Sequence, residues 1–288
     1  MQSQQPLAPS SVHPAQHQSG FTLVELMLVI VLFGILALGV TRYLEFGVSM
    51  YTQSTEVQHA LQQSRFALER LSRELRQATP NSIRITEDLA SGVSCIEFVP
   101  IRQSGIYQDA PIFPLRRDWL SVVFLDSSWQ GAAGQRLSIY PTDPAHLYQL
   151  SQLRTAVLAT QNLDDGDGNN RTQQVRLAPQ SGLAATFATA SPQRRFYLLS
   201  EPVSYCKQGA DLLRYTDYGF AATQPFPPTS PGMLMATGLT NSASEPVFRY
   251  DRAVLTRNAV VHLFWRFSLT QEQPELFFNH EVHLPNVP

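Results

Sequence analysis

The chain of 288 residues has a formal net charge of −2 at pH 7, and 43% of its residues are hydrophobic. This composition is typical of a globular protein rather than a nucleic-acid-binding one. Two isolated arginine pairs, Arg116-Arg117 and Arg194-Arg195, provide no basic stripe. We therefore expect no nucleic-acid partner.

The first predicted element is a membrane span over residues 21–41. Every residue from Phe21 to Val40 is apolar or small except Thr22 and Glu25. As a helix this run is roughly 30 Å long, which matches the hydrocarbon core of a bilayer. The 20 residues before it contain no Lys or Arg, whereas an ordinary secretory signal begins with a basic segment. We expect residues 1–20 to be a leader that is removed and the apolar run to be kept.

Glu25 is a carboxylate inside this predicted span. On insertion scales such a charge costs about 2.5 to 3.5 kcal/mol, so a partner charge is expected. Cleavage after Gly20 would create a positive amine at Phe21, near the same apolar layer. The two groups are poorly placed to meet on one helix, but the amine of one subunit can meet the carboxylate of its neighbour. The alternative is a plain membrane anchor whose Glu25 reaches the bilayer surface.

An amphipathic helix is predicted to continue over residues 42–79, until Pro80 ends it. Its apolar stripe has alternating spacings of three and four and consists of Val57, Leu61, Ser64, Leu68, Leu71, Leu75 and Ala78. The stripe favours packing on the chain's own sheet over a coiled-coil seam, since it lasts only about three heptads. Charged pairs at i,i+4, namely Arg65-Glu69, Glu69-Arg73 and Arg70-Glu74, indicate a solvated face.

Residues 80–288 have the pattern of β structure and are long enough for one sizeable domain or two small lobes. Apolar or alternating runs separated by turn residues predict strands at 95–99, 119–125, 137–140, 196–199, 202–206, 212–215, 247–250, 260–269 and 276–284. In the run at 260–269, Val261, Leu263, Trp265 and Phe267 fall on one face. We expect antiparallel sheets with one side against the helix, and therefore an α+β fold.

One acidic segment has the spacing of a calcium loop. Asp165, Asp167 and Asn169 occupy alternate positions, as oxygen ligands of calcium do. The EF-hand pattern fails because Arg176 stands where the bidentate glutamate belongs. Gly and Asn are also ordinary turn formers, so a solvated hairpin turn is favoured over a weak calcium site. No other cofactor is expected.

Catalytic motifs are missing from the sequence. His280 and His283 are three residues apart and would face opposite sides of a strand, so joint zinc binding is not expected. The sequence contains no nucleophile elbow, P-loop or dinucleotide fingerprint. We expect no catalytic residues and no enzyme activity.

The segment Gly20-Phe21-Thr22-Leu23-Val24-Glu25, followed by an apolar helix, resembles the signal of type IV pilins and of type II secretion pseudopilins. The resemblance implies a pilin-like fold and a prepilin peptidase that cuts between Gly20 and Phe21 and methylates Phe21. It assigns Glu25 to the alignment of subunits. It also implies a single-pass protein of the bacterial inner membrane, with its C-terminal domain in the periplasm before it enters a filament.

Two further segments resemble minor pilins, in particular those of the mannose-sensitive haemagglutinin (MSHA) pilus. They are residues 65–84, and residues 202–206 with 212–215. The resemblance implies a minor pilin at the filament tip that primes assembly, with major and minor pilins and an inner-membrane assembly platform as partners. A J-type minor pseudopilin of type II secretion is the nearest alternative. A pilus-displayed adhesin, with Trp129, Tyr140 or Tyr148 as exposed aromatics, and a periplasmic enzyme on a signal anchor are the others.

The two cysteines, Cys95 and Cys206, both follow the predicted span. Since the resemblance implies the periplasm, an oxidising compartment, it favours a disulfide between them. Two separate buried thiols are the alternative, because the sequence does not give their separation.

Overall fold

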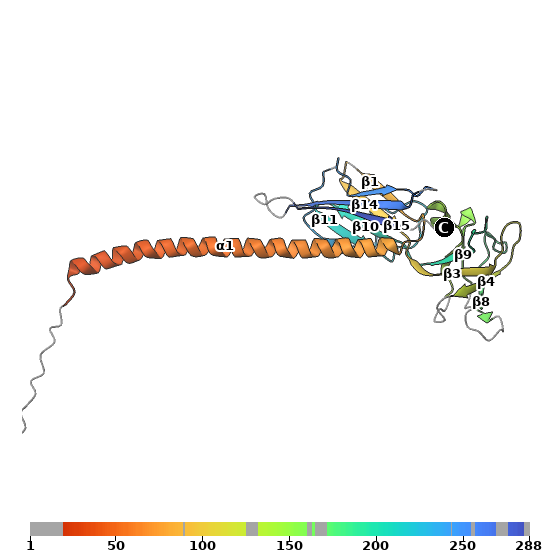
Figure 1. Cartoon of the computed structure of the whole chain (residues 1–288), viewed down its shortest axis with the longest axis horizontal. Helices are drawn as coiled ribbons and strands as arrows, with labels where there is room; N and C mark the ends of the chain where they lie inside the picture. The colour runs from red at the N-terminus through yellow and green to blue at the C-terminus, as the bar shows by residue number, and fades with distance from the viewer. Residues whose placement is uncertain are drawn as a thin grey trace, which may run out of the picture. The chain divides into compact units, whose positions relative to one another are not determined.

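The computed structural model describes residues 20–88, 90–124, 132–159, 163–164, 172–242, 244–254, 257–268 and 276–284. It confirms the predicted α+β architecture of one long N-terminal helix followed by antiparallel sheets (Figure 1). The chain divides into two compact units after Thr55, and each is described on its own.

Helix α1 (Leu23–Arg76) extends through 54 residues. It ends earlier than the predicted limit of 79. The amides of Gln77 and Ala78 bond carbonyls only three residues back, and the amide of Thr79 bonds the carbonyl of Val99 at 2.8 Å. The chain therefore leaves the helix to pair with another segment before Pro80 is reached. Because the backbone groups of 77–79 have these partners, the proline is not needed to stop the helix.

The second unit contains a main lobe formed by the end of α1 and two sheets. The five-stranded sheet has the order β1 (Arg84–Asp88), β2 (Val93–Phe98), β10 (Val203–Gln208), β11 (Asp211–Tyr215) and β12 (Met233–Ala236). The three-stranded sheet has the order β13 (Phe248–Asp251), β14 (Ala259–Phe267) and β15 (Leu276–Leu284). Neighbouring strands in both sheets are antiparallel.

The amphipathic half of α1 packs against both sheets, as predicted. Leu71 and Leu75 are fully buried in one core with Tyr205 of β10 and Trp265 of β14. Ala67, which the predicted stripe omitted, is also fully buried there. The stripe is thus used within the chain's own fold and does not form a coiled-coil seam. The predicted alternation in β14 is also confirmed, since its odd-numbered residues from 261 to 267 are buried and its even-numbered residues from 262 to 266 are half-buried.

A second lobe, the insert lobe, is built from residues 101–199 and has its own core. Its seven-stranded antiparallel sheet has the order β6 (Thr155–Val157), β5 (Arg136–Ser138), β9 (Arg195–Leu199), β3 (Ile101–Asp109), β4 (Trp119–Phe124), β8 (Thr172–Arg176) and β7 (Leu163–Asp164). Helix α2 (Ala145–Tyr148) and a 3-10 turn (Leu150–Gln152) belong to the same stretch. The whole lobe is inserted between β2 and β10 of the main lobe.

Gly105 in β3 is required by close packing inside the insert lobe. A Cβ atom at this position would lie 2.4 Å from the carbonyl oxygen of Val123 and 2.7 Å from the ring of Phe196. Since real Cβ atoms do not approach other atoms so closely, only glycine lets β3 lie against these neighbours.

Cys95 and Cys206 form the expected disulfide, with an S–S distance of 2.04 Å. The two residues are direct partners across the β2–β10 pair, and both are fully buried. The insert lobe follows β2 in the sequence and precedes β10. The disulfide therefore joins the two strands that flank the insert lobe.

A buried ion pair of the main lobe also contacts the insert lobe through its arginine. The side chain of Glu97 in β2 is fully buried and accepts hydrogen bonds from Arg84 of β1 and, at 2.9 Å, from the hydroxyl of Tyr218. The guanidinium of Arg84 also stacks on the ring of Tyr148 in α2, 3.6 Å from its centroid. Burial raises the pKa of Glu97, and the bonds from Arg84 oppose this rise. Arg84 thus contacts an acid of the main lobe and an aromatic ring of the insert lobe.

We predict that replacing Leu71 by alanine lowers the free energy of unfolding of the second unit by about 2–5 kcal/mol, because it leaves a cavity in the main core. Phe66→Ala is the matched control, since Phe66 lies on the same helix and is 56% exposed. Denaturant unfolding of the full chain in detergent measures both. Equal losses in the two variants would contradict the assigned packing face.

Removing the charge of Arg84 is predicted to lower the free energy of unfolding by more than removing both charges of the pair does. Arg84→Met leaves Glu97 buried without a cation, which typically costs about 3–5 kcal/mol of stability. The double variant Arg84→Met/Glu97→Leu removes the stranded charge and should recover most of that loss. Urea unfolding of the three proteins compares them, and a double variant as unstable as the single one would refute the ion pair's role.

Candidate functional site at the start of the helix

The predicted cleavage bond lies just outside α1. Gly20 and Phe21 are exposed and non-helical, and the helix begins at Leu23. Thr22 caps it, because its hydroxyl oxygen accepts the amide of Glu25 at 3.3 Å and its carbonyl accepts the amide of Leu26 at 3.2 Å. Thr22 and Glu25 have the spacing of a capping box. The bond between Gly20 and Phe21 therefore lies outside the helical hydrogen bonds of α1.

Nothing in the described part of the chain requires glycine at position 20. A Cβ atom built on Gly20 meets no atom within 4 Å, and its backbone is not in the left-handed region. A larger side chain would fit this position in the folded protein. Within the described residues, neither packing nor backbone conformation explains a glycine here.

Glu25 lies in the first turn of α1, where the partial positive charge of the helix N-terminus favours an acid. It is exposed, and the next ionisable residues along the chain are Arg42 and Tyr43. Its carboxylate is thus a single charge at the start of a long apolar stretch. No ion pair among the described residues engages it, so its charge is available to another molecule.

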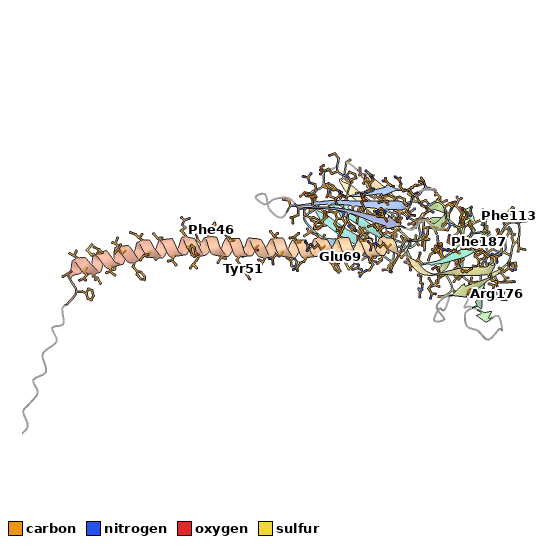
Figure 2. The ribbon with its side chains drawn as sticks, viewed as in Figure 1. Phe46, Tyr51, Glu69, Phe113, Arg176 and Phe187 are labelled. Carbon is orange, nitrogen blue, oxygen red and sulfur yellow. A yellow bond between two sulfur atoms is a disulfide. The ribbon has the colours of Figure 1, made fainter. Side chains whose placement is uncertain are left out.

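The first unit exposes an unusually large apolar surface. Large hydrophobic side chains between positions 21 and 51 are 51% to 81% exposed, and Figure 2 shows two of them, Phe46 and Tyr51, projecting from α1. By length and composition, α1 is the one helix in the described part of the chain able to cross a membrane. Soluble monomers rarely expose such a continuous apolar surface. The surface requires lipid or other apolar helices around it.

Hydroxyl groups along this part of α1 are satisfied without water. Those of Thr41, Ser49, Thr52 and Thr55 donate to carbonyls three or four residues back in the helix, at 2.7–3.1 Å. Such internal bonds let these residues enter an apolar environment at low cost.

Residues 15–41 match a family model described as the prokaryotic N-terminal methylation motif. The match includes Gly20, Phe21 and Glu25. Comparisons with curated proteins and with solved structures gave no match. The chain thus carries a type IV pilin-like signal, followed by a pilin-like α+β architecture.

Glu74 is a further organising residue, and the sequence placed it on a solvated face. One of its carboxylate oxygens accepts Arg70 Nε at 3.1 Å, and the other accepts Arg214 Nε and the hydroxyl of Tyr205, both at 3.1 Å. Burial raises the pKa of Tyr205, so its phenol stays protonated and donates. The i,i+4 spacing reveals only the pair with Arg70. The contacts with β10 and β11, which hold α1 on the main lobe, depend on tertiary structure.

Two other expectations concern metal binding. Asp165, Asp167 and Asn169 lie outside the described residues, so the weak calcium site stays a prediction. His280 and His283 occupy alternate faces of β15, in agreement with the strand pattern. Within the described ranges, no group of three or more His, Cys, Asp or Glu side chains is arranged to hold a metal ion.

Of the three aromatic residues proposed for an adhesin surface, the structure describes Tyr140 and Tyr148, and neither is fully exposed. Tyr148 was expected to be exposed, but this is wrong, because it is only 3% exposed beneath Arg84 and its hydroxyl donates to the carbonyl of Ser82. Tyr140 is half-buried, and Trp129 lies outside the described residues.

We predict that Gly20→Val abolishes leader removal and leaves the fold intact, because the folded protein has room for the larger side chain. Intact mass of the membrane-extracted protein measures the leader directly. The matched control is Gly39→Val, which introduces the same side chain at another position with open space around it and should be cleaved normally. Normal cleavage of Gly20→Val would show that the motif is not read at this glycine.

Proposed function

We propose that the protein is a minor pilin of a type IV pilus of the MSHA kind, comparable to MshO, and that it enters the filament at its tip and primes assembly. The match of residues 15–41 to the methylation motif carries the pilin-like part of this proposal, and the resemblance of residues 65–84, 202–206 and 212–215 to minor pilins supports the rest. A prepilin peptidase cuts the exposed bond between Gly20 and Phe21 and methylates the new amine of Phe21. The mature chain then begins two residues before α1.

Pairing of charges between neighbouring subunits would drive incorporation. In the apolar layer, the amine at Phe21 and the carboxylate of Glu25 are each poorly solvated, and an unpaired carboxylate there costs about 2.5–3.5 kcal/mol. When the helices of two subunits lie side by side, the amine of one meets Glu25 of the other. The same arrangement covers the exposed apolar side chains of both helices.

The size of the second unit supports a place at the end of a filament. Its main lobe and insert lobe together span residues 56–288. A domain of this size is difficult to repeat along a thin filament but can be accommodated at its tip. Before assembly, α1 would anchor the chain in the inner membrane with the sheets in the periplasm. The Cys95–Cys206 disulfide agrees with an oxidising compartment.

Partners follow from this role. The peptidase, the inner-membrane assembly platform, and major and minor pilins would contact the chain in turn. A J-type pseudopilin of type II secretion shares the same signal and helix. We infer a structural rather than a catalytic role for both lobes.

Intact mass and N-terminal sequencing of the extracted protein, with and without a prepilin peptidase in the host, test the proposal most directly. We expect a peptidase-dependent N-methylated phenylalanine derived from Phe21. An intact leader in the presence of the enzyme would reduce the protein to a membrane-anchored β domain. Restoration of pili or of secretion in strains lacking the minor subunits then separates the pilus from the secretion system.

Glu25→Ala is predicted to leave cleavage intact and to reduce the amount of the protein in sheared filaments, because the amine of the adjoining subunit loses its partner. Glu45→Ala is the matched control, since it removes a carboxylate from the same helix beyond the apolar stretch. Immunoblots of the filament and membrane fractions compare the variants. Equal incorporation of all three proteins would rule out the charge pairing.

A further inference from the structure

Lys207 is the only lysine in the chain, and it occupies a position that its strand pattern reserves for an apolar side chain. Alternate residues of a strand share one face. Val203 and Tyr205, which precede Lys207 on the same face of β10, belong to the core that α1 covers. Lys207 itself is 7% exposed. Its ammonium group is therefore at the edge of the main core, and burial lowers its pKa.

Among the described residues, no carboxylate lies within ion-pair distance of this ammonium group, which has one long hydrogen bond. Its hydrogen-bond acceptor is the carbonyl of Gly92 at 3.5 Å, which is at the long limit for such a bond. None of the ion pairs between described residues includes it, and burial alone accounts for its altered pKa. A buried charge without a partner is unfavourable, so the position calls for a ligand or a function.

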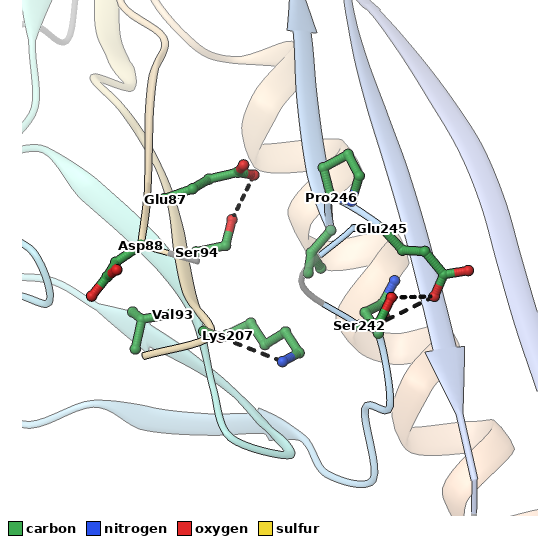
Figure 3. Close-up of a pocket in the computed structure, with 11 residues that line it drawn as sticks. Glu87, Asp88, Val93, Ser94, Lys207, Ser242, Glu245 and Pro246 are labelled. Carbon is green, nitrogen blue, oxygen red and sulfur yellow. Dashed lines mark hydrogen bonds between the residues drawn. The ribbon is translucent and has the colours of Figure 1, made fainter. Parts of the chain in front are cut away.

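The amine points into a pocket between the two sheets of the main lobe. Figure 3 shows it directed from β10 toward Ser242, across a gap that lies between β1 and β2 on one side and the segment before β13 on the other. The pocket opens to solvent and is small, with a cavity volume of about 40 Å³. Val93, Pro246 and Val247 provide apolar walls.

The carboxylates around the pocket already accept hydrogen bonds from other side chains. Glu245 accepts Arg266 Nη1 at 2.5 Å, and Glu87 accepts the hydroxyl of Ser94 at 3.0 Å. Asp88 accepts the hydroxyl of Ser91 at 2.6 Å, and Figure 3 shows it directed away from the amine. The hydroxyl partners do not neutralise Glu87 and Asp88, so both carboxylates still repel an anion, and a monoanion is repelled less than a dianion. A dianion such as phosphate would be repelled by the acids at the rim.

We propose that this pocket binds one carboxylate group on a short aliphatic stem, with Lys207 as its counter-charge and Val93 and Val247 against the stem. A small free acid and an acidic side chain of a neighbouring protein present the same chemistry. The site is separate from the N-terminal signal and does not depend on processing.

A lysine-specific isotope label tests binding, because the full chain in detergent then gives a single side-chain signal from Lys207. The probe is sodium acetate, compared with sodium chloride and sodium phosphate at equal ionic strength. We expect a saturable shift of the Lys207 ¹³Cε and ¹⁵Nζ resonances with acetate alone. The same shift with all three salts, or none with acetate, would overturn the proposal.

Two variants show whether the pocket is responsible. Val93→Trp fills the space without altering Lys207 and should abolish the acetate shift. Val254→Trp adds the same side chain at a position that is 51% exposed and does not line the pocket, so it should keep the shift. An acetate shift that survives Val93→Trp in a folded protein would also overturn the proposal.

Carbodiimide cross-linking of the assembled protein identifies the source of the carboxylate, and only this second experiment rests on the proposed filament function. The reagent joins an amine to a carboxylate in contact, and Lys207→Arg provides the control that cannot form this amide. An amide between Lys207 and another chain would identify a neighbouring subunit. Acetate binding without such an amide would identify a small acid, and would leave the filament proposal to its own tests.

Discussion

The apolar surface of α1 between Leu23 and Tyr51 is the constraint on which the rest depends. These side chains are exposed in the described structure, and water is an unfavourable environment for so much continuous hydrocarbon. Lipid and the helices of other subunits are the two surroundings that remove this cost. When the helix moves from lipid to a site among other helices, one set of apolar contacts replaces another. The hydrophobic effect alone therefore favours neither environment strongly. The proposed charge pairing at Glu25 would supply a direction, because the matching amine would come from another subunit.

The second part of α1 packs on the sheets of the main lobe. Ala67, Leu71 and Leu75 are fully buried in the main core, and Glu74 bonds residues of β10 and β11. Hydrophobic burial holds this segment to the sheets, while the directional bonds of Glu74 fix which residues face which. The change from one environment to the other occurs within one continuous element, and it is encoded by the change from all-round apolar sequence to a stripe.

The sequence was most informative where a local pattern carries the structure. The apolar run and the helical stripe can be recognised from their spacing, and the signal around Gly20 and Glu25 from its resemblance to a known family. Strands with alternating apolar residues, such as β14, were predicted for the same reason. Strands β1, β3, β6, β7, β8 and β12 were not predicted, because they are short or rich in polar residues and are defined by their neighbours in a sheet. The segment of β8 contains Thr172, Gln173 and Gln174, which have no apolar alternation to detect.

The buried polar contacts were beyond any sequence pattern. Glu97 and Arg84 are 13 residues apart, and the ring of Tyr148 that completes their cluster comes from the other lobe. The expectation that Tyr148 is exposed failed because an aromatic residue in a short helix gives no local indication of what covers it. The early end of α1 was missed for a similar reason, since the pairing of Thr79 with Val99 is a tertiary contact that overrides the signal of Pro80.

The disulfide also has a consequence for proteolytic damage to the protein. Cys95 and Cys206 are 111 positions apart in the sequence, and the entire insert lobe from 101 to 199 lies between them. A single peptide-bond break anywhere in that lobe leaves both fragments covalently joined at the centre of the five-stranded sheet. The main lobe and α1 would stay in one molecule. A protein cut once by a protease within the insert lobe would therefore keep both fragments attached to its helix.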